Sequence, residues 1–134
     1  GLNSFAAIKS IQLTKGVGTP IFMAPEMLGG SPIYAESADI YSFGVMMCHV
    51  ANNELPYLND TRFSTSYQFV QNVIDGMRPI LKCDVPEDYR LLMQRCWARN
   101  PDARPPFSVI SDLLEDMFLA ARKHLPSATS ILRH

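Results

Sequence analysis

Residues 36–51, ESADIYSFGVMMCHVA, carry the clearest structural signal in the sequence. Their apolar side chains recur every three or four residues, at Ile40, Phe43, Met47 and Val50 or Ala51. This spacing follows the 3.6-residue turn of an α-helix and places the four side chains on one side of it. The segment is therefore predicted to be an amphipathic helix. Asp39 comes just before the apolar stripe, near the positive end of the helix dipole.

The same periodicity predicts three more helices downstream of a polar loop at residues 52–60. Apolar residues at 69–74 mark a short helix that Gly76 would end as its C-terminal cap. A third helix is expected to open at Asp84 and Glu87, whose spacing resembles a capping box. Its buried face would comprise Tyr89, Leu92, Met93, Cys96 and Trp97. After a proline-rich break, apolar residues at 109–121 predict a fourth helix of about 15 residues with its apolar stripe in the core.

Residues 1–34 differ from the rest because they contain many turn-forming residues and little helical periodicity. One short helical turn is expected near residues 25–28. No segment shows a convincing strand pattern, so the predicted fold class is mainly α with a long irregular N-terminal segment. An irregular run of this length is usually functional, or packs on something outside the chain.

Length, composition and charge exclude several classes of protein. The 134 residues fit one domain, and 47% apolar with 19% charged residues is ordinary for a globular protein. A net charge of -1 disfavours nucleic-acid binding, and no apolar run reaches the length of a membrane span. The histidines show no metal-ligand spacing. Cys48, Cys83 and Cys96 are odd in number and form no Cys-x-x-Cys pair, which argues against a disulfide framework and a zinc site. A reducing, cytoplasmic location is therefore expected.

Four motifs occur in a characteristic order: GTPIFMAPE at 18–26, DIYSFG at 39–44, RCW at 95–97 and NPDARP at 100–105. Their order and spacing resemble the C-terminal lobe of eukaryotic protein kinases over roughly residues 1 to 120. One motif alone would be weak, but four in register are a strong signal. The resemblance implies an activation segment and substrate-binding loop at 1–34 and a helical kinase lobe at 35–122. The terminal residues 123–134 are expected to be a disordered tail.

The resemblance assigns structural roles to three charged residues. It implies a buried ion pair between Glu26 and Arg104, tying the activation segment to the loop before the last helix. Without the resemblance, both would be read as ordinary exposed charges. For Asp39 it implies hydrogen bonds from a catalytic loop that this sequence does not contain. The simpler alternative for Asp39 is a favourable position at the helix N-terminus.

Gly18, Thr19 and Pro20 are the substrate-binding residues that the resemblance implies. In serine/threonine kinases the matching threonine bonds the catalytic aspartate and helps to position the acceptor hydroxyl. From the residues alone, Thr19 is better read as a turn hydroxyl. The stretch lacks the Pro-x-Lys/Arg-Trp pattern of tyrosine kinases, which favours serine/threonine specificity. YSFG and RCW nonetheless resemble the tyrosine-kinase-like branch of the family.

Residues 3–15 would form the activation loop, where Ser4, Ser10 and Thr14 are candidate phosphorylation sites. For any one of them, an unmodified loop hydroxyl is the simpler alternative. Gly1 and Leu2 resemble the end of an Asp-Phe-Gly-Leu motif, which places the magnesium-binding aspartate before this chain. The absence of an initiator methionine also hints at a fragment.

Phosphoryl transfer needs a glycine-rich loop, a phosphate-binding lysine, a catalytic aspartate and metal-binding side chains. None of their motifs occurs in the 134 residues, so we expect no catalytic residue here and an inactive fragment. ATP and magnesium are expected only for the intact parent. Three alternatives to a serine/threonine kinase stay open: a pseudokinase lobe acting as a protein-binding scaffold, a tyrosine-specific kinase, or an independent helical interaction module.

The expected partners are a protein substrate and the missing N-terminal portion of the kinase. Without that portion, part of the apolar surface of the helix at 36–51 should be bare. Exposed apolar patches of several hundred Å² favour association. An oligomer, or an assembly that exchanges the N-terminal segment, is therefore expected for the fragment.

Overall fold

The computed structural model describes residues 19–124, and every described element is helical. The predicted mainly helical fold class is confirmed, since no strand occurs in that range. Ser4, Ser10, Thr14, Gly18 and most of the predicted tail lie outside the described residues. The elements are α2 (Pro25–Leu28), α3 (Glu36–Asn52), α4 (Ser66–Ile74), α5 (Glu87–Cys96), the 3-10 turn η1 (Pro101–Ala103) and α6 (Phe107–Arg122).

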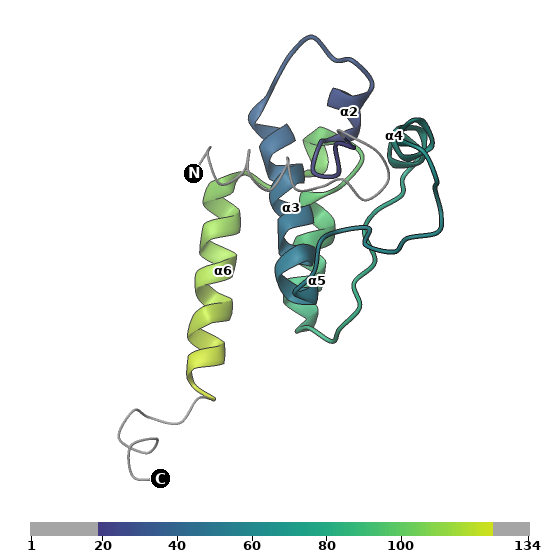
Figure 1. The fold of residues 1–134 in the computed structure, drawn as a ribbon. Coiled ribbons are helices and arrows are strands. Elements are labelled where there is room, and N and C mark those ends of the chain that lie inside the picture. The colour runs from purple at the N-terminus through teal and green to yellow at the C-terminus, as the bar shows by residue number, and fades with distance from the viewer. Residues whose placement is uncertain (1–18, 125–134) are drawn as a thin grey trace.

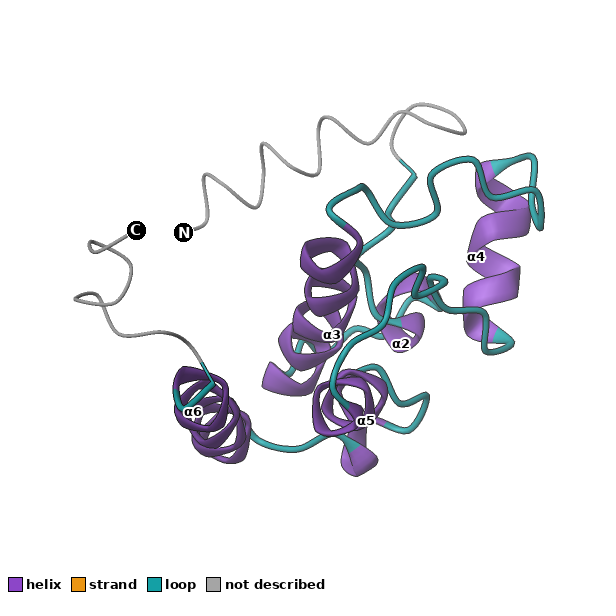
Figure 2. Cartoon of the chain, turned by 90° about the horizontal axis from the view of Figure 1, so that it is seen from below, coloured by secondary structure: helices purple, strands orange, loops and turns teal. Residues whose placement is uncertain are grey.

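Helix α3 lies at the centre and packs along α5, while α2 and α4 lie together on one side and α6 on the other (Figures 1 and 2). The predicted helix at 36–51 is confirmed with one more residue at its end. Tyr41, Val45 and Cys48 are fully buried on α3, whereas Val50 is 65% exposed. Helices α3 and α5 lie close together at Gly44, where an added Cβ would lie 2.9 Å from Cys96 Cβ.

Both ends of α4 follow from local sequence. The Thr65 hydroxyl accepts the Gln68 N–H at 3.1 Å and caps the start of the helix. Gly76 has a φ of 117°, and its N–H donates to the Val73 carbonyl at 3.0 Å. The Met77 N–H donates to the Asn72 carbonyl at 2.8 Å, which completes a Schellman motif. The predicted glycine cap is confirmed.

The predicted capping arrangement at the start of α5 is wrong. The helix begins at Glu87, and the N-cap position belongs to Pro86, which has no side chain that could cap the helix. Asp84 stands two residues before that cap, too early for its carboxylate to serve the first helical N–H groups. The predicted buried face is confirmed: Leu92, Met93, Cys96 and Trp97 are buried, and the Tyr89 hydroxyl donates to the Met47 carbonyl at 2.8 Å.

Helix α6 has the predicted position, and its 16 residues match the expected length. Its burial does not match the prediction, because only Ile110 is fully buried and Phe118 is 64% exposed. The reason is tertiary: α6 contacts the rest of the molecule mainly along one edge, against α5. No helix within residues 19–124 is long and apolar enough to cross a membrane.

Candidate functional site

The candidate site is built on the segment from Thr19 to α2. The Ile21 N–H donates to the Thr19 carbonyl at 3.1 Å, and the Met23 N–H donates to the Pro20 carbonyl at the same distance. These two turns bring the chain to Pro25, whose fixed φ suits the first position of a helix. The Ser42 hydroxyl of α3 donates to the Phe22 carbonyl at 2.7 Å. The segment is thus bound directly to the central helix.

The structure brings Glu26 and Arg104 together as a bidentate ion pair. The Arg104 Nη1 and Nη2 atoms lie 2.7 and 2.8 Å from the Glu26 carboxylate oxygens. The guanidinium also donates to the carbonyls of Ala98 at 2.8 Å and Ser37 at 2.9 Å. The Arg104 side chain is 0% exposed and that of Glu26 is 24% exposed. One buried arginine therefore joins α2, the start of α3 and the loop after α5.

The environment of Glu26 favours its charged form. Burial alone would raise the pKa of this carboxyl, but the hydrogen bonds and the charge of Arg104 outweigh it, so the pKa lies below its ordinary value of 4.5. The more distant charge of Arg78 acts in the same direction. The ion pair is consequently complete at neutral pH.

This lowered pKa predicts a pH-dependent contribution to stability. A carboxyl with a depressed folded pKa stabilises the fold fully above its unfolded pKa, and the contribution disappears as pH falls through the folded pKa. The stability difference between the wild type and Glu26→Gln should therefore be largest near neutral pH and shrink below about pH 4.5. Urea unfolding at a series of pH values measures it.

Glu87→Gln is the matched control, because Glu87 pairs with Arg90 on the exposed surface. Its stability difference from the wild type should be small at every pH. A difference for Glu26→Gln that stays constant from neutral to acid pH would show that the carboxylate charge does not stabilise the fold.

Arg78 is a residue of the site that sequence reasoning missed. Its Nε donates to the Trp97 carbonyl at 2.9 Å, and its Nη1 donates to the carbonyls of Val73 at 3.0 Å and Met77 at 2.7 Å. Its guanidinium lies 4.9 Å from the ring centre of Tyr41, which Arg104 approaches at 5.2 Å. Tyr41 thus has a cation–π contact with both arginines. The one local hint was an arginine placed two residues after a helix-ending glycine.

Tyr41 itself is one of the most deeply buried side chains of α3. Burial raises the pKa of Tyr41 to about 12, although the nearby guanidiniums of Arg78 and Arg104 oppose that shift. The phenol is therefore neutral at physiological pH, and its ring serves as a packing surface for the two cations. The contact links the end of α4 to the Glu26–Arg104 pair.

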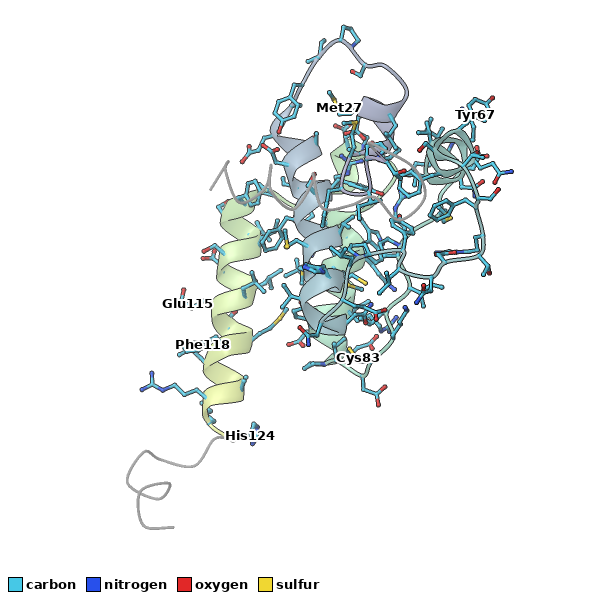
Figure 3. All side chains as sticks on the ribbon, in the orientation of Figure 1. Met27, Tyr67, Cys83, Glu115, Phe118 and His124 are labelled. Atoms are coloured by element: carbon cyan, nitrogen blue, oxygen red, sulfur yellow. The ribbon has the colours of Figure 1, made fainter. Side chains whose placement is uncertain are left out.

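A mostly apolar pocket of about 140 Å³ lies beside the segment. Asp39, at its rim, is exposed and accepts a hydrogen bond from the Tyr34 hydroxyl. The carboxylate is therefore neither buried nor without a partner. Figure 3 labels Met27, on α2 at the edge of this region. The pocket is lined by Pro20, Phe22, Met23, Ala24, Met27, Tyr34, Ala38, Asp39 and Ser42.

The substrate-binding candidates do not all line this pocket. Pro20 does, whereas Thr19 is only 1% exposed and its hydroxyl lies 2.9 Å from the Ser66 hydroxyl at the start of α4. The bond spans 47 residues of sequence and joins the segment to α4. Within residues 19–124 no group of three or more histidine, cysteine or acidic side chains is placed to hold a metal ion.

The helical lobe and its buried Glu26–Arg104 pair agree with the arrangement that the sequence motifs implied. Comparison with known families gives the class: the model of the protein kinase domain matches residues 3–134. The chain belongs to the protein kinase family and represents part of its C-terminal lobe.

Relatives in Dictyostelium discoideum agree with this assignment. The chain is 36% identical to dual specificity protein kinase shkD over 102 residues, which are 76% of the chain and 13% of that protein. It is 35% identical over 109 residues to a probable serine/threonine-protein kinase, covering 81% of the chain and 8% of the relative. A probable LIM domain-containing serine/threonine-protein kinase is 34% identical over 104 residues, covering 78% of the chain and 15% of the relative. The chain thus spans less than a fifth of each.

Proposed function

We propose that the chain supplies the substrate-binding part of a serine/threonine protein kinase. The observation that carries this proposal is the Glu26–Arg104 pair, which ties the segment at residues 19–28 to the core beside an apolar pocket. A segment held in this way is preorganised, so it loses little further conformational entropy when a peptide binds. Pro20 and Met23 would contact an apolar side chain of that peptide.

Serine or threonine is the proposed acceptor. The segment lacks the Pro-x-Lys/Arg-Trp pattern that marks tyrosine kinases, and two of the relatives carry serine/threonine-protein kinase in their names. The relative named as a dual specificity kinase makes tyrosine the alternative that an experiment has to test.

We further propose that the 134 residues alone do not transfer phosphate. ATP and magnesium would supply the phosphoryl group and its charge neutralisation in the whole protein, held by residues outside this chain. This part of the proposal rests on the absence from the sequence of a glycine-rich phosphate loop and of a His-Arg-Asp motif.

Peptide binding tests the proposal. Peptide pools with a fixed central serine, threonine or tyrosine would be titrated against the 134-residue chain by fluorescence anisotropy. Serine and threonine pools should bind more tightly than the tyrosine pool. Met23→Glu should weaken binding by about tenfold or more, because it places a charge in the apolar pocket. Ile33→Glu is the control, since Ile33 is exposed and does not line the pocket.

Two results would count against the proposal. Equal weakening by Met23→Glu and Ile33→Glu would remove the pocket from substrate binding, and a preference for the tyrosine pool would reverse the assigned specificity. Calorimetric titration with ATP and magnesium supplies the second measurement. Saturable nucleotide binding to the chain would contradict its proposed inactivity.

A further inference from the structure

Helix α6 has an apolar edge that packs partly against the core as far as Leu114 and is exposed at Phe118 and Ala121. Phe107, Leu114, Phe118 and Ala121 follow one another at spacings that keep them on one side of the helix. Phe107 packs edge-on against Phe43 of α3, with ring centres 6.1 Å apart, but further along Phe118 is 64% exposed. The apolar edge is thus partnered at its start and open at its end.

A shallow groove of about 460 Å³ runs beside this open part, between α6 and the start of α5. Its wall on α6 is mainly apolar, and Pro86, Asp88 and Tyr89 contribute the wall at the start of α5. Figure 3 shows Phe118 and Glu115 projecting from α6 on the side away from α3. The surface is therefore open to another molecule.

Two opposite charges border the same edge. Glu115 and Arg122 are both exposed and stand seven residues apart, so they lie on the same side of the helix. Seven residues correspond to a rise of about 10.5 Å, which is too far for an ion pair within one helix. None of the ion pairs found within residues 19–124 involves either side chain. Each charge is thus available to a partner outside the helix.

We propose that α6 is a self-association surface on which a second copy of this chain binds, with the two helices antiparallel. In a two-fold arrangement that sets Phe118 against Ala121 of the second copy, Glu115 of each copy meets Arg122 of the other. The large ring then faces a small side chain, and both ion pairs form because the two-fold axis repeats every contact. A parallel pair in register would instead place equal charges at the same level.

This inference goes beyond the proposed kinase function and does not depend on it. It also assigns association to α6, where the sequence led us to expect it on the helix at 36–51. A single helix edge buries less than the roughly 800 Å² per partner of standard interfaces. The dimer should therefore be weak and reversible, with a dissociation constant on the order of 0.1 mM.

Sedimentation equilibrium of the 134-residue chain, from about 10 µM to 1 mM, tests the proposal over the range that brackets this affinity. Arg122→Glu and Glu115→Arg should each weaken association by about tenfold, because two ion pairs are lost and two repulsive contacts form. The double exchange Glu115→Arg with Arg122→Glu should restore association to about the wild-type strength. That rescue requires the two positions to meet across the interface.

Lys123→Glu is the matched control, because it makes the same change in net charge one residue away and off the apolar edge. It should leave association unchanged. All of these side chains are exposed, so circular dichroism should show a folded chain in every variant. A wild type that stays monomeric over the whole range, or a double exchange as weak as the single variants, would overturn the proposal. Neither outcome bears on the proposed kinase function, since the sedimentation experiment contains no peptide and no nucleotide.

Discussion

Replacing Arg104 with alanine is expected to lower the free energy of unfolding by about 3 kcal/mol. The side chain is completely buried, and its removal leaves the Glu26 carboxylate without its partner and takes one donor from each of the carbonyls of Ala98 and Ser37. Because the Glu26 side chain is 24% exposed, water can partly solvate the carboxylate that Arg104 leaves behind. The loss of stability should therefore lie at the lower end of the range for broken buried ion pairs. Urea denaturation measures the change.

Two variants make this result specific. Arg90→Ala removes an ion pair with Glu87 on the exposed surface, and it should cost less than about 1 kcal/mol. Arg104→Lys keeps the charge but cannot bind both carboxylate oxygens and the two carbonyls in the same fixed geometry, so it should recover only part of the stability. A cost for Arg104→Ala no larger than that of Arg90→Ala would mean that the pair does not hold the segment.

Replacing Gly44 with valine should also cost about 3 kcal/mol, through overpacking between α3 and α5. A Cβ at this position would lie 2.9 Å from Cys96 Cβ and 3.1 Å from both the Met93 carbonyl oxygen and the Trp97 nitrogen. Two of these three atoms are backbone atoms of α5 and its C-cap residue, so they cannot move aside as the end of a long side chain could. The two helices would have to separate.

Gly44→Ala separates this steric effect from helix propensity. Propensity alone predicts that alanine stabilises a helix interior by about 1 kcal/mol relative to glycine. The close approach predicts the opposite sign, a loss of about 1 to 2 kcal/mol. Val50→Ala, at a position of α3 that is 65% exposed, is the control and should change stability little. A Gly44→Ala variant more stable than the wild type would refute the steric account.

Much of the helical architecture could be predicted from the sequence because its determinants are local. The apolar period in residues 36–51 marks α3, and Gly76 ends α4 since its φ of 117° suits glycine best. The start of α5 could not be predicted in the same way. The sequence offers two candidate N-cap residues within three positions, Asp84 and Pro86. In the structure Pro86 is the N-cap residue that Asp84 was expected to be.

The candidate site was predictable only in part. Glu26 and Arg104 are separated by 78 residues, and composition and periodicity place no constraint on such a distance. Their pairing was expected only because the motifs resemble a known family. Arg78 was not foreseen, because its contacts with three carbonyls and with Tyr41 depend on how α3, α4 and α5 come together.

By itself, the sequence determined which segments are helical and to which family the chain belongs. The apolar period, the helix caps and the motifs each involve residues that are close together in the sequence. The tertiary structure decided which side chains meet and which face water. Leu92 and Phe118 both lie on apolar stripes, yet Leu92 is buried in the core and Phe118 is exposed because α6 is covered along one edge only. The physical reason is that burial depends on the neighbouring elements, whereas periodicity describes the helix alone.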